Sequence, residues 1–328
     1  MQRRQSLAAL GAAAAGLAAL ALPRWSRAQE AWPNRTVKII APVAPGGGVD
    51  LVARTMADRL GRAFGQTFVV ENQSGGGGTI ASMAVTRAAP DGYTLMLGYV
   101  GTHGTNPAVR KLPYDAINGF SPIGMVGGTP NVLVVTPSLP VASVKAFVAY
   151  LKANPAKISY GSAGQGTLTH LVMEQFKEDN QVFMVHAPYR GIGPAILDVL
   201  GGQTQAAFPG LAAALPHIIS KKLQPLAVTG VVRHRLLPDV PTMLELGFKG
   251  FDGVQWYGLM GPPNLPRPLV ARLNAEINQQ INSPDLRDKL AAEALDTMPM
   301  SPEQFGAYIK SDIDKWSRLI KSRKIDLE

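Results

Sequence analysis

Short apolar runs alternate with longer segments of helical periodicity along most of the chain. The runs at 37–43, 67–71 and 93–99 are rich in β-branched and other apolar residues, which predicts three buried strands. Residues 49–64 and 79–88 lie between them and place apolar side chains three or four positions apart, which predicts helices. This β-α-β-α-β order predicts a parallel sheet covered by helices.

A second round of the same kind fills the middle of the chain. Strands are predicted at 132–136, 158–161, 182–186, 204–208 and 224–229, with helices at 144–154, 167–179, 194–201 and 211–221. Three more helices are predicted after a Pro-rich stretch, at 268–282, 284–293 and 302–321. The last helix carries one apolar stripe, typical of packing on a core, formed by Phe305, Ile309, Ile313, Trp316 and Ile320. Two rounds of this kind predict an α/β protein with two domains.

The first 28 residues follow a different pattern. Arg3 and Arg4 precede an unbroken small and apolar run at 7–22, and Ser26 and Ala28 are small residues at two positions before a cut after Ala28. This arrangement predicts an export signal that is cleaved near Ala28. A membrane anchor is disfavoured, because the run is shorter than the roughly 20 residues needed to cross a bilayer. The paired arginines leave both the twin-arginine and the general secretory routes open.

Composition excludes several functional classes. The chain has 328 residues and a net charge of +9, but four basic residues lie within the first 28, and removing that stretch leaves +5. The remaining basic residues are spread along the chain, so nucleic acid is not an expected partner. The chain contains no cysteine, which excludes disulfides, Cys-ligated zinc, iron–sulfur clusters, thiol nucleophiles and lipid attachment through an N-terminal Cys.

A glycine-rich turn follows the first predicted strand and leads into the first predicted helix. We name residues 44–48 the first turn, and its candidate ligand-binding residues are Ala44, Gly46, Gly47 and Gly48, together with Asp50 in the helix. Glycines let backbone N–H groups approach a ligand closely, and a helix N-terminus favours negative charge. The turn can therefore hold a carboxylate or a phosphate without a cationic side chain. The alternative is that the turn only caps its helix.

A similar turn, residues 162–167, follows the strand predicted at 158–161, and we name it the second turn. Its candidate residues are Ser162, Ala163, Gly166 and Thr167, with His170 one helical turn further on. The two hydroxyls are candidate donors to an anion, whereas His170 either orients the turn, faces a ligand or is a structural histidine. One such turn in each round favours an anion-binding cleft over two unrelated caps.

Other chemistry is poorly supported by the sequence. The phosphate-binding loop, the dinucleotide fingerprint and the Gly-x-Ser-x-Gly nucleophile elbow are all missing, and no pair of histidines has zinc-protease spacing. We therefore expect no cofactor, no metal and no catalytic residue. Asp198 lies in an apolar helical stretch, and the pattern leaves open whether it faces the cleft or solvent.

Taken in order, the sequence motifs resemble the Bug family, the periplasmic receptors of tripartite tricarboxylate transporters. The resemblance covers nearly the whole mature chain and rests on Trp32-Pro33, Ala44-Pro45-Gly46-Gly47 with Asp50, Pro90-Asp91-Gly92-Tyr93-Thr94-Leu95, Leu112-Pro113-Tyr114-Asp115, Tyr160-Gly161-Ser162-Ala163-Gly164, Pro188-Tyr189-Arg190-Gly191 and Leu237-Pro238-Asp239-Val240-Pro241-Thr242. Two departures are Arg190, where relatives usually carry Lys, and Gly48-Val49, where many relatives carry a polar residue before the Asp.

The resemblance implies a periplasmic binding protein of type II, with two α/β domains of mainly parallel sheet that close around a ligand like a flytrap. Domain 1 would comprise 29–128 plus 232–328, and domain 2 would comprise 129–231. A ligand carboxylate would lie on both turns, with Thr102 and His103 on the floor of the cleft and Tyr189 and Phe208 on its walls.

We therefore expect a monomeric, non-enzymatic receptor that is free in the periplasm, is not lipid-anchored, and delivers a small organic carboxylate to the membrane permease subunits of a tripartite tricarboxylate transporter. A receptor that reports to a signalling partner is the first alternative, and a periplasmic enzyme is a weaker one. The sequence does not separate dicarboxylates and tricarboxylates from aromatic acids or amino acids.

Overall fold

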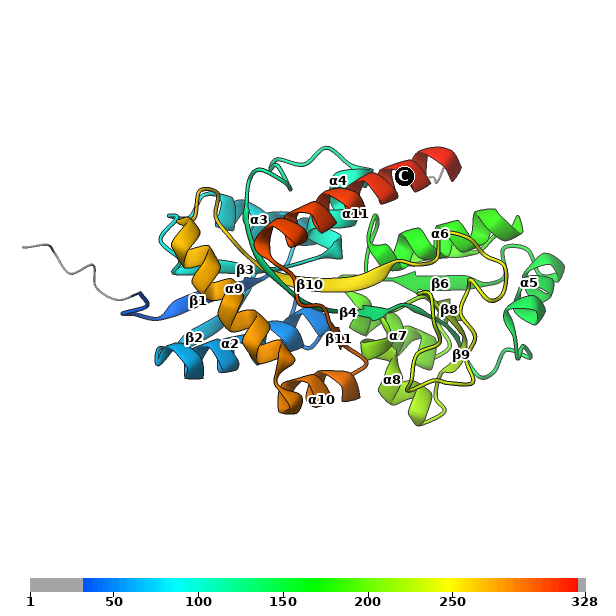
Figure 1. Ribbon diagram of the computed structural model, residues 1–328. Coiled ribbons are helices and arrows are strands. Elements are labelled where there is room, and N and C mark those ends of the chain that lie inside the picture. Colours follow the sequence, from blue (N-terminus) through cyan, green and yellow to red (C-terminus); the bar gives the residue numbers. More distant parts are fainter. Residues whose placement is uncertain (1–31, 324–328) are drawn as a thin grey trace, which may run out of the picture. The chain divides into compact units, whose positions relative to one another are not determined.

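The computed structural model describes residues 32–323, and the compact unit described below begins at Arg35. The predicted signal peptide, 1–28, and its predicted cleavage near Ala28 lie outside the described residues. The unit that begins at Arg35 contains two β-sheets with helices packed against both (Figure 1).

The first sheet has the spatial order β11-β4-β10-β3-β1-β2. Its strands are β1 (Val37–Ala41), β2 (Phe68–Asn72), β3 (Thr94–Tyr99), β4 (Ser121–Pro130), β10 (Val254–Gly261) and β11 (Asp296–Thr297). β1 pairs in parallel with β2 and β3, in agreement with the prediction. β10 pairs antiparallel with β3 and β4, and β11 pairs antiparallel with β4. The sheet is thus mixed rather than mainly parallel, because three strands not expected from the sequence extend the parallel part.

The second sheet has the order β7-β6-β8-β5-β9. Its strands are β5 (Val132–Val135), β6 (Ser159–Ser162), β7 (Val185–Pro188), β8 (Ala206–Ala207) and β9 (Gln224–Val228). β6 pairs in parallel with β7 and β8, whereas β5 pairs antiparallel with β8 and β9. The predicted strand order along the chain is confirmed, although β7 begins three residues later than predicted. In Figure 1 this sheet lies among the green helices of the middle of the chain.

The helices agree with the predicted positions, with one short addition. They are α2 (Gly48–Phe64), α3 (Thr79–Thr86), α4 (Asn106–Val109), α5 (Val144–Ala153), α6 (Leu168–Asn180), α7 (Ile192–Leu200), α8 (Leu211–Ile219), α9 (Arg267–Asn282), α10 (Pro284–Ala292) and α11 (Pro302–Arg323). A 3-10 turn, η2 (Gly76–Gly78), and a π-helical turn, η3 (Gly101–Thr105), precede α3 and α4. α4 was not predicted.

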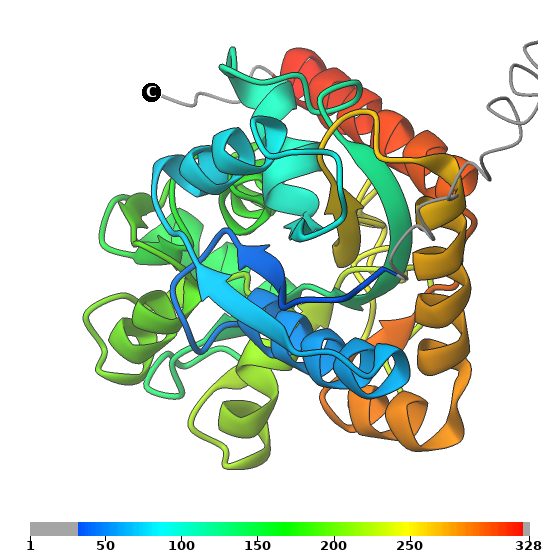
Figure 2. The same ribbon diagram turned by 90° about the vertical axis from the view of Figure 1, so that its left-hand side faces the viewer.

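Local sequence accounts for several helix ends and faces. α2 is followed by the capping residue Gly65, which has a left-handed φ of 66° that glycine adopts without strain. α5 is preceded by the N-cap residue Ser143, whose hydroxyl accepts a hydrogen bond from the Ala146 N–H at 3.1 Å. The stripe predicted on α11 is confirmed as a packing face, since Phe305 and Trp316 are fully buried. In Figure 2, α11 (red) and α9 (orange) lie beside β4, which both helices contact.

The two sheets are connected where the chain leaves β4 for β5 and where it returns from β9 to β10. At this point the Thr229 hydroxyl accepts a hydrogen bond from the Asn131 N–H and donates one to the Gly253 carbonyl, each at 2.8 Å. The Thr229 N–H also donates to the Asn131 carbonyl at 2.7 Å. Asn131 and Thr229 are both fully buried, so the two connecting segments are joined by a group of hydrogen bonds shielded from water.

Candidate functional site

Asp50 holds the first turn in place through hydrogen bonds. The Asp50 carboxylate accepts hydrogen bonds from the Gly46 N–H, the Arg54 Nε and the Asn72 Nδ2, at 3.0, 3.0 and 2.8 Å. Burial by itself would raise the pKa of Asp50, but these hydrogen bonds outweigh it and lower the pKa below its ordinary value. Asp50 therefore stays ionised and fixes the shape of the turn. The Asp50 oxygens accept hydrogen bonds from protein groups, and a direct contact from Asp50 to a ligand remains a prediction.

The opposite side of the first turn is open. Ala44 and Gly46 are exposed, Gly47 and Gly48 are half-buried, and a β carbon at Gly46 or Gly47 would meet no atom within 4 Å. Gly47 caps α2 with no side-chain hydrogen bond, so the first amides of the helix lack the partner that a Ser or Asp cap would supply. These groups and the helix dipole make the first turn suited to an anion.

The second turn differs, because its own groups satisfy one another. The Ser162 hydroxyl lies 2.7 Å from His186 Nε2 and accepts from the Gly164 N–H, and the Thr167 hydroxyl donates to the Gly164 carbonyl at 2.6 Å. The Ala163 N–H donates to the Thr169 hydroxyl at 2.9 Å. Ser162 and Thr167 were expected to donate to a ligand, but in the structure their hydroxyls point into the turn, so that role remains a prediction.

His170 orients the second turn from underneath. Its Nδ1 accepts a hydrogen bond from the Gly166 N–H at 3.1 Å, and its ring stacks on His186 with centroids 4.1 Å apart. His186 in turn stacks on Tyr160 at 4.8 Å. Burial lowers the pKa of both histidines to about 4, so both rings are neutral near pH 7. Of the three roles left open for His170, turn orientation matches these contacts.

Tyr189 and Asp198 form a pair beside the second turn. The Tyr189 hydroxyl donates to the Asp198 carboxylate at 2.5 Å, and burial together with this carboxylate raises the pKa of Tyr189 to about 12. A β carbon at Gly161 would lie 3.3 Å from the Tyr189 ring. Both side chains are half-buried. Asp198 therefore contacts Tyr189, and a contact from either side chain to a ligand remains a prediction. Phe208, the other expected wall residue, is fully buried and stacks on Phe251, which makes it a core residue.

The two expected floor residues lie in η3. Thr102 is fully buried and contacts η2, because a β carbon at Gly78 would lie 2.4 Å from the Thr102 methyl group. His103 is also fully buried and packs edge-on against Phe120 with centroids 4.4 Å apart. Burial lowers the pKa of His103 to about 3, so this ring is neutral. His103 therefore belongs to the core, and Thr102 supports the loop next to the first turn.

The structure adds two residues that the sequence reasoning missed. Tyr257 of β10 sits against the first turn, since a β carbon at Gly48 would lie 2.7 Å from its hydroxyl oxygen. Arg110, which follows α4, lies next to the second turn, since a β carbon at Gly166 would lie 3.9 Å from its Nη2. Neither residue belongs to a glycine motif, so only the tertiary fold reveals them.

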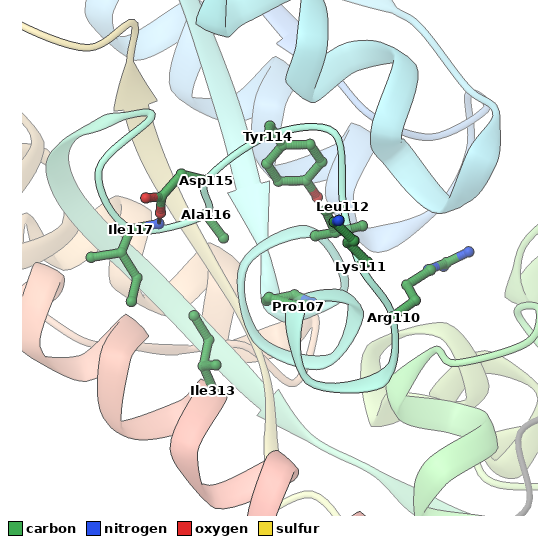
Figure 3. A pocket seen from close by; sticks show the side chains of 9 residues that line it. All are labelled: Pro107, Arg110, Lys111, Leu112, Tyr114, Asp115, Ala116, Ile117 and Ile313. Carbon is green, nitrogen blue, oxygen red and sulfur yellow. Dashed lines mark hydrogen bonds between the residues drawn. The ribbon is translucent and has the colours of Figure 1, made fainter.

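A hollow of about 290 Å³ opens on the Arg110 side of the molecule. It is lined by Pro107, Arg110, Lys111, Leu112, Tyr114, Asp115, Ala116, Ile117 and Ile313. No residue of either turn lines it, so the hollow is distinct from the predicted site. Figure 3 shows the Arg110 side chain directed away from the other lining residues.

Residues 32–323 contain no group of three or more His, Cys, Asp or Glu side chains placed to hold a metal ion. Over the same range, none of the helices combines the length and apolar character that crossing a bilayer demands.

Comparison with known proteins identifies the family. The family model described as "Tripartite tricarboxylate transporter family receptor" matches residues 52–325. The structure of R. palustris Rpa4515 with adipate has 33% sequence identity and a TM-score of 0.87, covering 90% of this chain and 99% of that one. The periplasmic binding protein BugD has 33% identity and a TM-score of 0.84, covering 90% of this chain and 99% of its own. MatC from Rhodopseudomonas palustris, with bound malate, has 29% identity and a TM-score of 0.83, covering 88% and 100%.

These likenesses confirm the mixed α/β fold of a periplasmic binding protein, and the resemblance to Bug proteins. The chain belongs to the tripartite tricarboxylate transporter receptor family.

Proposed function

We propose that the chain is an exported receptor that binds a small organic carboxylate on the first turn and delivers it to membrane permease subunits. The observation that carries the proposal is the first turn itself, a helix N-terminus with no side-chain cap, whose glycines leave open space for a ligand. Two family members of similar structure hold the carboxylates adipate and malate. Neutral donors bind such an anion while allowing its release.

The proposed site would lie between the first turn and the elements of the second sheet. The second turn would form the opposite wall, with Tyr189 and Asp198 beside it. The protein would act in the periplasm as a monomer, after cleavage near Ala28. A ligand that contacts both domains, 29–128 plus 232–328 and 129–231, would favour the closed arrangement, because only differential affinity shifts a conformational equilibrium.

Thermal unfolding with a panel of monocarboxylates, dicarboxylates, tricarboxylates, aromatic acids and acidic amino acids tests the proposal. A ligand at 100 times its Kd adds about 2.7 kcal/mol, which raises Tm by roughly 5 °C for a chain of this size. A protein stabilised by sugars or cations, but by no carboxylate, would show that the proposal is wrong. Native mass spectrometry of freshly purified protein identifies any ligand that it carries.

Gly47→Val tests the location of the site. A side chain at Gly47 meets no protein atom, and its backbone (φ −95°, ψ 173°) is extended, so the unliganded protein should keep its Tm. The new side chain would fill the space above the first turn, so we expect carboxylate binding to be lost. Ala275→Val on the exposed side of α9 is the matched control and should bind like the parent. Normal binding by Gly47→Val would place the site elsewhere.

A further inference from the structure

Arg110 is held in a fixed position between a loop of the first sheet and the second turn. Its Nη2 donates to the Asn106 Oδ1 at 2.6 Å, and the Asn106 Nδ2 donates to the Gly77 carbonyl at 2.7 Å. A β carbon at Gly77 would lie 2.6 Å from the same Nη2. The Asn106 amide and the bare backbone of Gly77 thus hold the guanidinium against η2.

The second turn approaches Arg110 from the other side. A β carbon at Gly166 would lie 3.9 Å from the Arg110 Nη2 and 2.8 Å from a Val109 methyl group. Gly166 also has a left-handed φ of +74°, so two independent constraints require glycine there. The guanidinium therefore lies where elements of the two sheets meet.

The charge of Arg110 has no carboxylate partner within residues 32–323. The ion pairs in that range involve Asp50, Glu71, Glu174 and other acids, but none includes Arg110, whose side chain donates to the neutral Asn106 amide. A guanidinium has five N–H donors in a planar fork that matches a carboxylate. Most of these donors are therefore available to a ligand, and the Arg110 side chain is exposed.

The position of Arg110 complements the two turns. The first turn offers backbone donors to one carboxylate, whereas the hydroxyls and amides of the second turn are largely used internally. η2, which Arg110 contacts, also lies beside the end of β1, because a β carbon at Gly78 would lie 3.2 Å from Pro42. Arg110 thus lies against both η2, which is next to the end of β1, and the second turn.

We infer that Arg110 binds the second carboxylate of a dicarboxylate ligand and so selects dicarboxylates over monocarboxylates. The inference rests on the proposed function and narrows its substrate class. The first turn supplies the common carboxylate site, and Arg110 adds a charged site at the far end of the carbon chain.

The test compares chain-matched pairs of acids, such as adipate and hexanoate, within a series from three to eight carbons. Calorimetric Kd values are measured for the parent, Arg110→Gln and Arg110→Lys. A hydrogen bond to a charged group predicts that Arg110→Gln weakens dicarboxylate binding about 10- to 100-fold and leaves monocarboxylate binding within about twofold. Arg110→Lys keeps the charge without the planar fork and should fall between the two.

Lys111→Gln is the matched control. It removes the same charge from the adjacent exposed residue and should leave the preference for dicarboxylates intact. A parent that binds only monocarboxylates, or an Arg110→Gln variant that keeps the preference, would overturn the inference while the proposed function stands. A parent that binds no carboxylate would overturn both. Equal Tm values for the unliganded proteins show that the variants fold alike.

Discussion

The contact between Gly48 and Tyr257 provides a sharp test of how the first turn is positioned. A β carbon at Gly48 would lie 2.7 Å from the Tyr257 hydroxyl oxygen and 3.4 Å from the Cζ that carries it. Tyr257 is buried in the centre of the first sheet, between β3 and β4, so the ring has little freedom to withdraw. Gly48→Ala must therefore displace the start of α2 or the ring by several tenths of an ångström.

Gly48→Ala should destabilise the protein, whereas Gly→Ala within a helix usually stabilises it. Without the contact, alanine would stabilise a helix by up to about 1 kcal/mol. Overpacking of a well-packed site costs about 1–3 kcal/mol, so the net loss should reach up to about 2 kcal/mol, or roughly 4 °C in Tm. Because the first amides of α2 move with Gly48, we also expect carboxylate Kd to rise at least tenfold.

Tyr257→Phe supplies the rescue. It removes the hydroxyl oxygen and leaves the nearest ring carbon at 3.4 Å, an ordinary contact. Urea unfolding of the parent, both single variants and the double variant gives the coupling energy, which should exceed about 1 kcal/mol in the direction of rescue. If Gly48→Ala costs the same with Phe at position 257 as with Tyr, the hydroxyl contact does not position the turn and the reasoning fails.

Two further predictions concern the groups beneath the turns. Asp50→Ala removes three hydrogen bonds and should lower the free energy of unfolding in urea by about 2–4 kcal/mol, and a loss under 1 kcal/mol would contradict the role given to Asp50. The pKa values of His170 and His186, lowered from 6.5 to about 4, make the unfolded state bind more protons below pH 6.5. Stability is therefore full above pH 6.5 and falls toward pH 4, by about 2 kcal/mol per histidine between pH 7 and pH 5. An NMR titration midpoint above pH 6 for either ring would refute this.

The sequence predicted the parallel parts of both sheets but missed β4 and β10. Runs such as Ser121–Pro130 contain Gly and Pro, which normally argue against a central strand. Glycine is needed at these positions because residues distant in the sequence pack closely against the backbone. A β carbon at Gly127 would lie 2.4 Å from the Asp296 carbonyl of β11, and one at Gly258 would lie 2.3 Å from the Phe305 ring. No local pattern carries that information.

In the candidate site, too, local features could be predicted from the sequence and long-range contacts could not. Glycines between a strand and a helix marked both turns, because their chemistry is local. In the second turn, the Ser162 hydroxyl is hydrogen-bonded to His186 rather than left free for a ligand. His186 lies 24 positions from Ser162 in the chain, and the pairing of β6 with β7 brings the two residues together. Arg110 follows α4, a four-residue helix with no periodicity to reveal it.

The buried hydrogen bonds among Asn131, Thr229 and Gly253 have a mechanical consequence. They tie the two connecting segments together at one point, so a relative displacement of the sheets in a straight line would break several shielded bonds at once. A rotation about that point stretches none of them greatly, and the movement it produces grows with distance from the axis. Receptor variants with altered closure should therefore arise from residues flanking positions 131, 229 and 253, rather than from those residues themselves.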